Sequence, residues 1–159
     1  YYPKNFYAST KSAFEMIMNY YTTKNKSLKF YNLKFYESFS EEDYRKKLIP
    51  QLLRNHKKNC YTKIISKNLE LNVIHLEDIV NSISLVLNKN IKSGTYCLIN
   101  KKNIKIDKLI KNINKKSKKK IKVKYLNHLK IAPSKSKLKI LPNWKPMYDI
   151  QKIIEDEFI

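Results

Sequence analysis

Glycine and arginine are scarce in this sequence. Among 159 residues glycine occurs once, at Gly94, and arginine twice, at Arg45 and Arg54. A single glycine excludes, within these residues, a Gly-rich strand-to-helix turn of the kind whose backbone amides approach a bound pyrophosphate. The scarcity of arginine argues against a nucleic-acid reader, because such proteins use arginine for bidentate contacts to bases and phosphates.

Cysteine and long apolar runs are scarce as well. Cys60 and Cys97 stand apart and form no cluster with zinc spacing, so no metal site is predicted. We interpret both as small buried residues in a reduced compartment. No apolar run is long enough to span a bilayer, and no secretory signal is found. A soluble cytoplasmic protein is therefore expected.

Lysine, by contrast, is abundant. The chain has 34 Lys+Arg against 13 Asp+Glu, a net charge of +21, with enough hydrophobic residues (42%) for a core. Such a charge suggests phosphate-bearing partners. However, an A+T-rich coding sequence also yields much Lys, Asn and Ile with little Arg or Gly. We therefore expect a solvated basic surface, an exposed turn at residues 115–120 and no nucleic-acid partner; a Lys-rich binding module without chemistry is the alternative.

The strongest functional signal lies in residues 5–21, which read as one amphipathic helix. Tyr7 and Lys11 stand four residues apart, so their side chains share one face of that helix. A nearby cation favours the phenolate, which would let Tyr7 exchange a proton with an alcohol or ketone. Helical spacing predicts an inner face formed by Ala8, Ala13, Phe14, Ile17 and Met18.

The same spacing recurs by chance in a chain rich in both residue types. Tyr20 and Lys24 repeat it on the same helix. A packed tyrosine beside a solvated lysine therefore remains the alternative for the first pair.

Four segments in order resemble the extended short-chain dehydrogenase/reductase family of nucleotide-sugar epimerases, dehydratases and reductases. These segments are YYPKNFYASTKSAFE (residues 1–15), LNVIHLEDIVNSISLVL (71–87), SGTYCLIN (93–100) and PSKSKLKILPNWKP (133–146). The amino-acid sequence of these segments is most similar to that of reductases that make CDP-linked dideoxysugars of the abequose and paratose type. Asp43 and Arg45 match the Asp-x-Arg of these reductases, whereas Phe39-Ser40-Glu41 replaces the family's usual Tyr-Gly-Pro.

The resemblance implies an α/β fold: the C-terminal portion of a Rossmann-type parallel sheet plus the small α/β substrate-binding domain. Residues 1–40 would end the dinucleotide-binding domain, and residues 41–159 would mainly form the nucleotide-sugar-binding portion, with interleaved returns to the sheet. It also implies that the chain is the second half of a longer protein, inactive alone, that forms a homodimer through the helix of Tyr7 and Lys11.

The implied reaction is hydride transfer between NAD or NADP and a nucleoside-diphosphate sugar. Reduction of a 4-keto sugar is the first hypothesis, and 4-epimerisation or dehydration the second. By resemblance, Tyr7 and Lys11 are the catalytic residues and also contact the cofactor.

The same resemblance assigns four further residues to binding. Phe35 would lie near the nicotinamide, with plain core packing as the alternative, and Glu37 would contact the substrate. Arg45 and Lys47 would bind the diphosphate, since the planar guanidinium suits phosphate oxygens. His75 could be a catalytic residue, but no carboxylate or Ser stands at a defined spacing from it, so we interpret it as a structural residue.

Local patterns predict the remaining elements. We expect a strand at residues 29–36, a short helix at 45–55 interrupted by Pro50, and a short strand at 60–65. Glu77 or Asp78 should cap the helix that follows LNVIHL, Gly94 should start a strand, and Asp107 should begin a helix. A last strand follows the lysine cluster, and Trp144 should anchor a C-terminal helix.

Overall fold

The computed structural model describes residues 3, 5–126 and 139–158. Its elements, in order, are α1 (Phe6–Lys24), β1 (Tyr31–Lys34), β2 (Glu37–Phe39), α2 (Leu48–Lys57), β3 (Thr62–Ile64), β4 (Glu70–Leu71), β5 (Val73–His75), α3 (Leu76–Asn88), β6 (Gly94–Cys97), β7 (Ile104–Lys105), α4 (Ile106–Lys116), β8 (Val123–Tyr125) and α5 (Ile150–Asp156). Most of the predicted helices and strands are present, but the strand expected at residues 29–36 covers only Tyr31–Lys34, and β2, β4 and β7 were not predicted as separate strands.

The strands pair mainly in parallel. Pairs β1–β6, β2–β5 and β3–β8 are parallel, and β4–β7 is antiparallel. Each parallel pair joins segments that are far apart in the sequence, and the intervening helices make these crossovers possible. The predicted α/β class with a parallel sheet is therefore confirmed.

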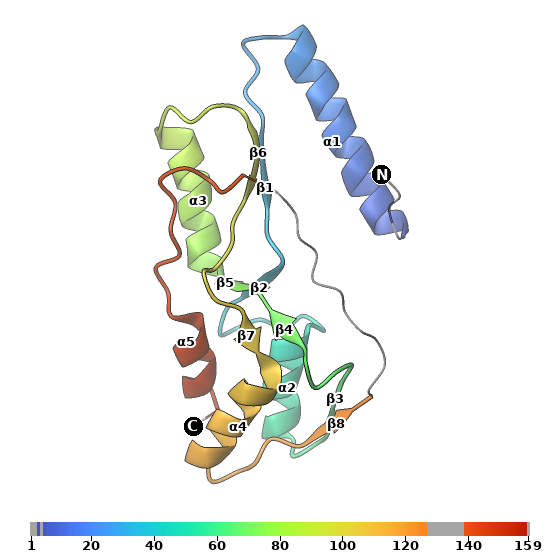
Figure 1. Cartoon of the computed structure of the whole chain (residues 1–159), viewed down its shortest axis with the longest axis vertical. Coiled ribbons are helices and arrows are strands. Elements are labelled where there is room, and N and C mark those ends of the chain that lie inside the picture. Colours follow the sequence, from blue (N-terminus) through green and yellow to red (C-terminus); the bar gives the residue numbers. More distant parts are fainter. Residues whose placement is uncertain (1–2, 4, 127–138, 159) are drawn as a thin grey trace.

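Two hydrophobic clusters form the core. The first lies among α2, α4 and α5 and includes Ile64, Ile113 and Ile154. The second lies between α3 and β6 and includes Trp144 and Leu98. Figure 1 shows α3 and β6 above α2, α4 and α5 along the long axis, with α1 beside the upper group.

The inner face predicted for α1 is wrong in part. None of its residues is buried, and Phe14 and Ile17 are 56% and 52% exposed. Ala8 and Met18 are half-buried, in line with the prediction, but the other half-buried positions of α1 are Ser9, Ser12, Glu15 and Thr22. A small and polar stripe faces the β1–β6 pair because that surface offers polar groups, as described below. The homodimer stays a prediction.

Other local expectations need correction. Pro50 lies in the first turn of α2 and does not interrupt it, because a first-turn residue has no intrahelical partner for its N–H. Cys60 is exposed, and only Cys97 is buried as predicted. The cap of α3 is His75, whose ring nitrogen accepts from the Glu77 amide at 3.2 Å.

Asp78 has a different role from the predicted cap. Its side chain is buried and accepts from the Met147 amide at 2.8 Å, while the Trp144 indole donates to its carbonyl at 3.0 Å. Trp144 thus anchors the segment that leads into α5, as predicted, and the residue before it, Asn143, adopts the left-handed φ of 61°.

Part of the C-terminal family signature, residues 133–138, lies outside the described residues. Within the part of the chain that is described, no helix has both the length and the apolar composition needed to cross a membrane.

Candidate active site

Tyr7 and Lys11 lie on the first turns of α1, on its exposed side. Asn5 caps the helix by accepting from the Ala8 amide at 2.8 Å, which fixes where the helix begins. Tyr7 is 70% exposed, and the Lys11 ammonium lies 5.5 Å from the centre of its ring. The predicted one-turn relationship is therefore present, with the amine over the face of the phenol ring.

Tyr20 and Lys24 repeat this arrangement at the other end of α1. The ammonium of Lys24 lies 5.8 Å from the Tyr20 ring centre, and Tyr20 is 59% exposed. The local geometry alone therefore does not distinguish the candidate pair. What distinguishes Tyr7 is its position in the family segment described above.

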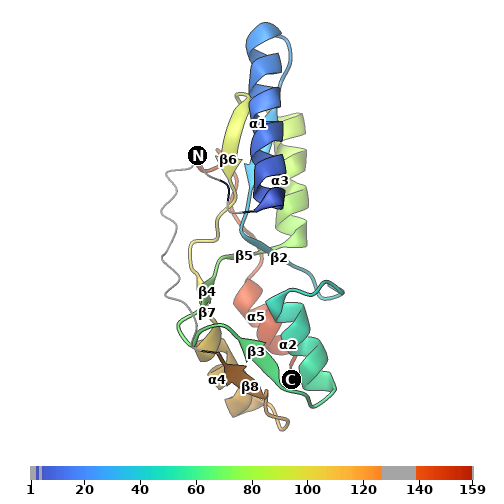
Figure 2. The same ribbon diagram turned by 90° about the vertical axis from the view of Figure 1, so that its right-hand side faces the viewer.

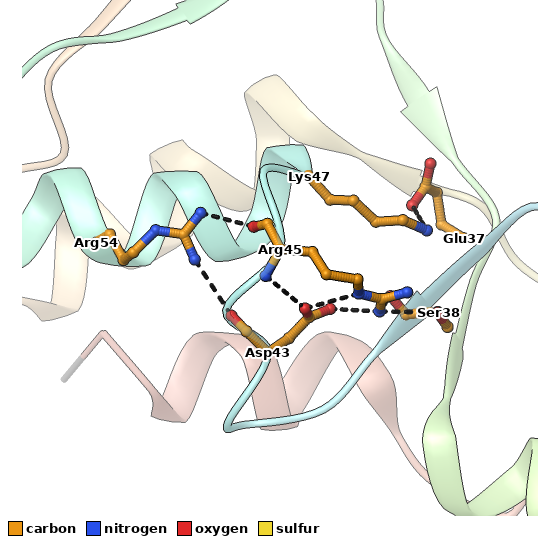
Figure 3. Close-up of polar contacts among 6 residues, drawn as sticks. All are labelled: Glu37, Ser38, Asp43, Arg45, Lys47 and Arg54. Atoms are coloured by element: carbon orange, nitrogen blue, oxygen red, sulfur yellow. Dashed lines mark hydrogen bonds and ion pairs between the residues drawn. The ribbon is translucent and has the colours of Figure 1, made fainter.

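Both arginines of the sequence converge on residues 40–47, the loop between β2 and α2 (Figure 3). Asp43 accepts from Arg45 through the backbone amide at 3.0 Å and through Nε at 2.8 Å, and it also pairs with Nη2. Nη2 further donates to the Ser38 hydroxyl at 3.0 Å. The hydrogen bonds from Arg45 lower the pKa of the Asp43 carboxyl, and those same bonds raise the pKa of Arg45.

Arg54 holds the same loop from the side of α2. Its Nη2 donates to the Arg45 carbonyl at 2.6 Å, and its Nη1 donates to the Asp43 carbonyl at 3.3 Å. Sequence reasoning did not assign any role to Arg54 or Ser38. The sequence feature that could have pointed to Arg54 is the scarcity of arginine, since Arg54 is one of only two arginines in the chain.

Glu37 and Lys47, two of the predicted substrate-binding residues, form an ion pair at 2.9 Å (Figure 3). Lys47 is also the N-cap residue of α2 but makes no side-chain cap bond, and the first turn of α2 carries no acidic residue. The helix start therefore keeps its unpaired amides and positive end beside Arg45 and Lys47, an arrangement that attracts anions.

The structure brings together three of the predicted site residues: Glu37, Arg45 and Lys47. Phe35, 41% exposed, lies between β1 and β2 on the chain that leads to this cluster. Among the hydrogen bonds and ion pairs of the described residues, none joins Tyr7 or Lys11 to the cluster. The residues thus form two groups, one on α1 and one at the start of α2.

His75 is buried and held on three sides. Its ring stacks on Tyr148 with centroids 4.2 Å apart, Nε2 lies 3.3 Å from a Glu41 carboxylate oxygen, and Nδ1 caps α3. These contacts are those of a structural histidine that joins the loop, α3 and the C-terminal segment.

Comparison with known proteins shows the family of this chain. The model of the NAD dependent epimerase/dehydratase family matches residues 1–99, which include both groups. The chain belongs to the NAD dependent epimerase/dehydratase family. A comparison with curated protein sequences finds no match.

Several solved structures share the fold of this chain, although their sequence identity to it is low. UDP-glucuronic acid 4-epimerase from Bacillus cereus in complex with NAD is 17% identical with a TM-score of 0.77, and the match covers 99% of this chain and 52% of that one. dTDP-glucose 4,6-dehydratase from Bacillus anthracis in complex with NAD is 18% identical with a TM-score of 0.74, over 99% and 52%.

A third structure extends the comparison beyond the genus Bacillus. UDP-N-acetylglucosamine 4-epimerase from Methanobrevibacter ruminantium, in complex with UDP-N-acetylmuramic acid, is 15% identical with a TM-score of 0.72. The match covers 99% of this chain and 54% of that one. The chain thus spans about half the length of the solved structures that it matches.

Proposed function

We propose that this chain supplies the proton-transfer helix and the diphosphate-binding loop of an NAD(P)-dependent enzyme acting on a nucleoside-diphosphate sugar. The observation that carries the proposal is that the family match over residues 1–99 contains Tyr7 and Lys11, exposed one turn apart on a capped helix. In this proposal, residues 1–40 carry the proton-transfer helix and Glu37, and residues 41–159 carry the rest of the diphosphate site.

Tyr7 is the proposed proton donor and acceptor. Its hydroxyl gives a proton to the carbonyl oxygen of a keto sugar during reduction and takes it back when the alcohol is oxidised. Lys11, one turn later, can donate to a ribose hydroxyl. A nicotinamide cofactor, when bound, supplies or accepts the hydride.

The residues present fit one end of such a cofactor. The exposed Tyr7 and Lys11 offer a hydroxyl and an ammonium to a nicotinamide ribose, and Phe35 offers an exposed ring. The pyrophosphate end requires a Gly-rich turn, and the single Gly94 begins β6 and does not form one. Residues 1–159 are therefore expected to hold the dinucleotide only at its reactive end.

The start of α2 is the proposed diphosphate site. Arg45, with a side chain 46% exposed, and Lys47 lie at the positive end of the helix, where no acidic residue occupies the first turn. Lys47 would exchange its partner Glu37 for a phosphate oxygen, which frees the Glu37 carboxylate to accept from a sugar hydroxyl. Arg45 keeps Asp43 as its positioning partner.

Reduction of a 4-keto CDP-sugar is the reaction that we favour, because the segments around Tyr7 and Asp43 resemble reductases of the abequose type. Epimerisation or dehydration within the same family is the second candidate, supported by the family match. All three reactions use the same proton transfer at Tyr7.

The test is an assay of the gene product that carries residues 1–159. Incubation with NADH or NADPH and a CDP-4-keto-6-deoxy sugar should consume the reduced cofactor in proportion to the ketone. Interconversion of C4 epimers, or loss of water from a nucleotide sugar, without net consumption of the cofactor would instead favour the second candidate. Absence of all three conversions would overturn the proposal.

A further inference from the structure

Two lysine-rich segments that are far apart in the sequence lie side by side at one end of the molecule. Residues 54–67 and 111–126 contain twelve lysines and no Asp or Glu. The parallel pairing of β3 with β8 joins the two segments, and the Lys119 ammonium donates to the Lys57 carbonyl at 2.8 Å. Figures 1 and 2 show β3 and β8 at the end of the long axis opposite α1.

Within this end of the molecule, two lysines stand directly opposite each other. Lys63 on β3 and Lys124 on β8 are register partners, and both are exposed. Like charges at opposed positions of neighbouring strands repel each other, so this pair opposes folding unless an anion lies over it. Lys58 and Lys118 are exposed residues of the same two segments, and we call Lys58, Lys63, Lys118 and Lys124 the lysine tip.

Several lysines outside this group have partners. Lys34, Lys47, Lys105, Lys111 and Lys116 pair with carboxylates. Lys119 and Lys120 donate to carbonyls at the ends of α2 and α4, a common role for lysine at helix C-termini. In the described part of the chain, no ion pair involves any of the four lysines of the lysine tip.

Apolar side chains emerge between these charges. Tyr61 is 67% and Ile65 41% exposed, and they directly precede and follow β3, with the exposed Lys63 at the centre of that strand. The Lys122 ammonium lies 5.9 Å from the Tyr61 ring centre and covers one face of that ring.

We propose that the lysine tip docks on the surface of a bilayer that contains anionic lipid. Lipid phosphates and carboxylates would neutralise the lysines, and Tyr61 and Ile65 would enter the headgroup region, where Tyr is favoured. A nucleic acid accounts less well for the surface, because it offers no apolar layer to Ile65, and one face of the Tyr61 ring is already covered. The inference does not depend on the proposed reaction.

The test compares two variants of equal net charge. One replaces the lysine tip (Lys58, Lys63, Lys118 and Lys124) with Gln, and the control replaces four exposed lysines elsewhere (Lys26, Lys29, Lys101 and Lys102) with Gln. Co-sedimentation uses vesicles of phosphatidylcholine with or without phosphatidylserine. We expect the tip variant to bind the anionic vesicles roughly 600-fold more weakly than the wild type, since each of its four lysines contributes about fivefold near the surface, whereas the control keeps at least a tenth of wild-type affinity.

Equal loss of binding in both variants would show that only net charge matters and would overturn the proposal. So would failure of the wild type to bind anionic vesicles, or tighter binding of a single-stranded oligonucleotide through the same lysines. If the tip variant fails to fold, hydrogen exchange on the wild type decides: anionic vesicles should protect residues 58–65 and 118–124, and protection elsewhere contradicts the inference.

Discussion

Glu15 accepts two hydrogen bonds from the Lys34 ammonium, at 3.0 and 2.7 Å, and this ion pair ties the helix of Tyr7 and Lys11 to strand β1. Thr95 on β6 donates to the same carboxylate at 3.3 Å. Because α1 has no buried residue, these polar contacts contribute much of what positions the helix against the strands.

Replacing Glu15 with Gln should therefore loosen α1. Both partners are about one-third exposed or less, so the loss in unfolding free energy should stay below about 1 kcal/mol. Hydrogen exchange over residues 6–24 should nevertheless become severalfold faster, since the helix loses its charged anchor. Lys29→Gln, a change at an exposed lysine two residues before β1, is the control; equal acceleration in both variants would contradict this role.

Asp43 should make stability depend on pH. Its pKa is lowered in the folded state by Arg45, so its contribution is present above the unfolded-state pKa of about 4 and is lost as pH falls through the lower folded-state pKa. Asp43→Asn should cost about 1–2 kcal/mol at pH 7, and the difference from wild type should shrink at pH 2–3. Urea unfolding at both pH values measures this.

Asp156 provides the control for that experiment. It is an exposed carboxylate at the end of α5, and Asp156→Asn should leave stability unchanged at either pH. A difference between wild type and Asp43→Asn that persists undiminished at pH 2–3 would rule out the ion pair as its source.

Asp78 should be essential for attaching the C-terminal segment. Its buried carboxylate accepts from the Met147 amide, so Asp78→Ala leaves that amide without its partner and should cost about 2–3 kcal/mol. Trp144, the only tryptophan, donates to the Asp78 carbonyl and reports the change directly. Its emission should shift to longer wavelength in Asp78→Ala and stay unchanged in the exposed neighbour variant Glu77→Ala.

Arg54 should position the proposed diphosphate site without touching the ligand. Arg54→Gln removes two hydrogen bonds that hold the carbonyls of Asp43 and Arg45. We expect affinity for a nucleoside diphosphate to fall roughly tenfold, as for the loss of one or two charged hydrogen bonds, with kcat little changed. Gln51→Ala, at an exposed position of α2, is the control. A fall in kcat at constant KM would contradict a positioning role.

The sequence predicted where helices and strands lie better than it predicted which side of a helix packs against the rest of the protein. Asn5 before a long periodic run indicates where α1 begins, and β3 and β6 follow from short apolar segments. The face of α1 could not be read from Phe14 and Ile17, because helical spacing says only which residues share a side. Which side packs depends on the neighbours, here the polar Lys34 and Thr95, that only the fold brings together.

The candidate site shows the same limit. Arg45 and Lys47 were identified by charge and resemblance, and the structure places both at the start of α2. The pairing of Arg45 with Asp43 and of Lys47 with Glu37 depends on how the loop of residues 40–47 folds back toward β2. Arg54 reaches that loop from the last turns of α2, a relationship that no local pattern encodes.

The most direct test of the account compares Tyr7→Phe with Tyr20→Phe in the gene product that carries residues 1–159. The two tyrosines lie on one helix with nearly the same lysine geometry, so they differ chiefly in their proposed role. Loss of the proton donor should lower kcat for the keto sugar about a hundredfold or more in Tyr7→Phe, while Tyr20→Phe keeps wild-type turnover. Wild-type kcat in Tyr7→Phe, or an equal loss in both variants, would contradict the assignment of Tyr7 as the catalytic residue.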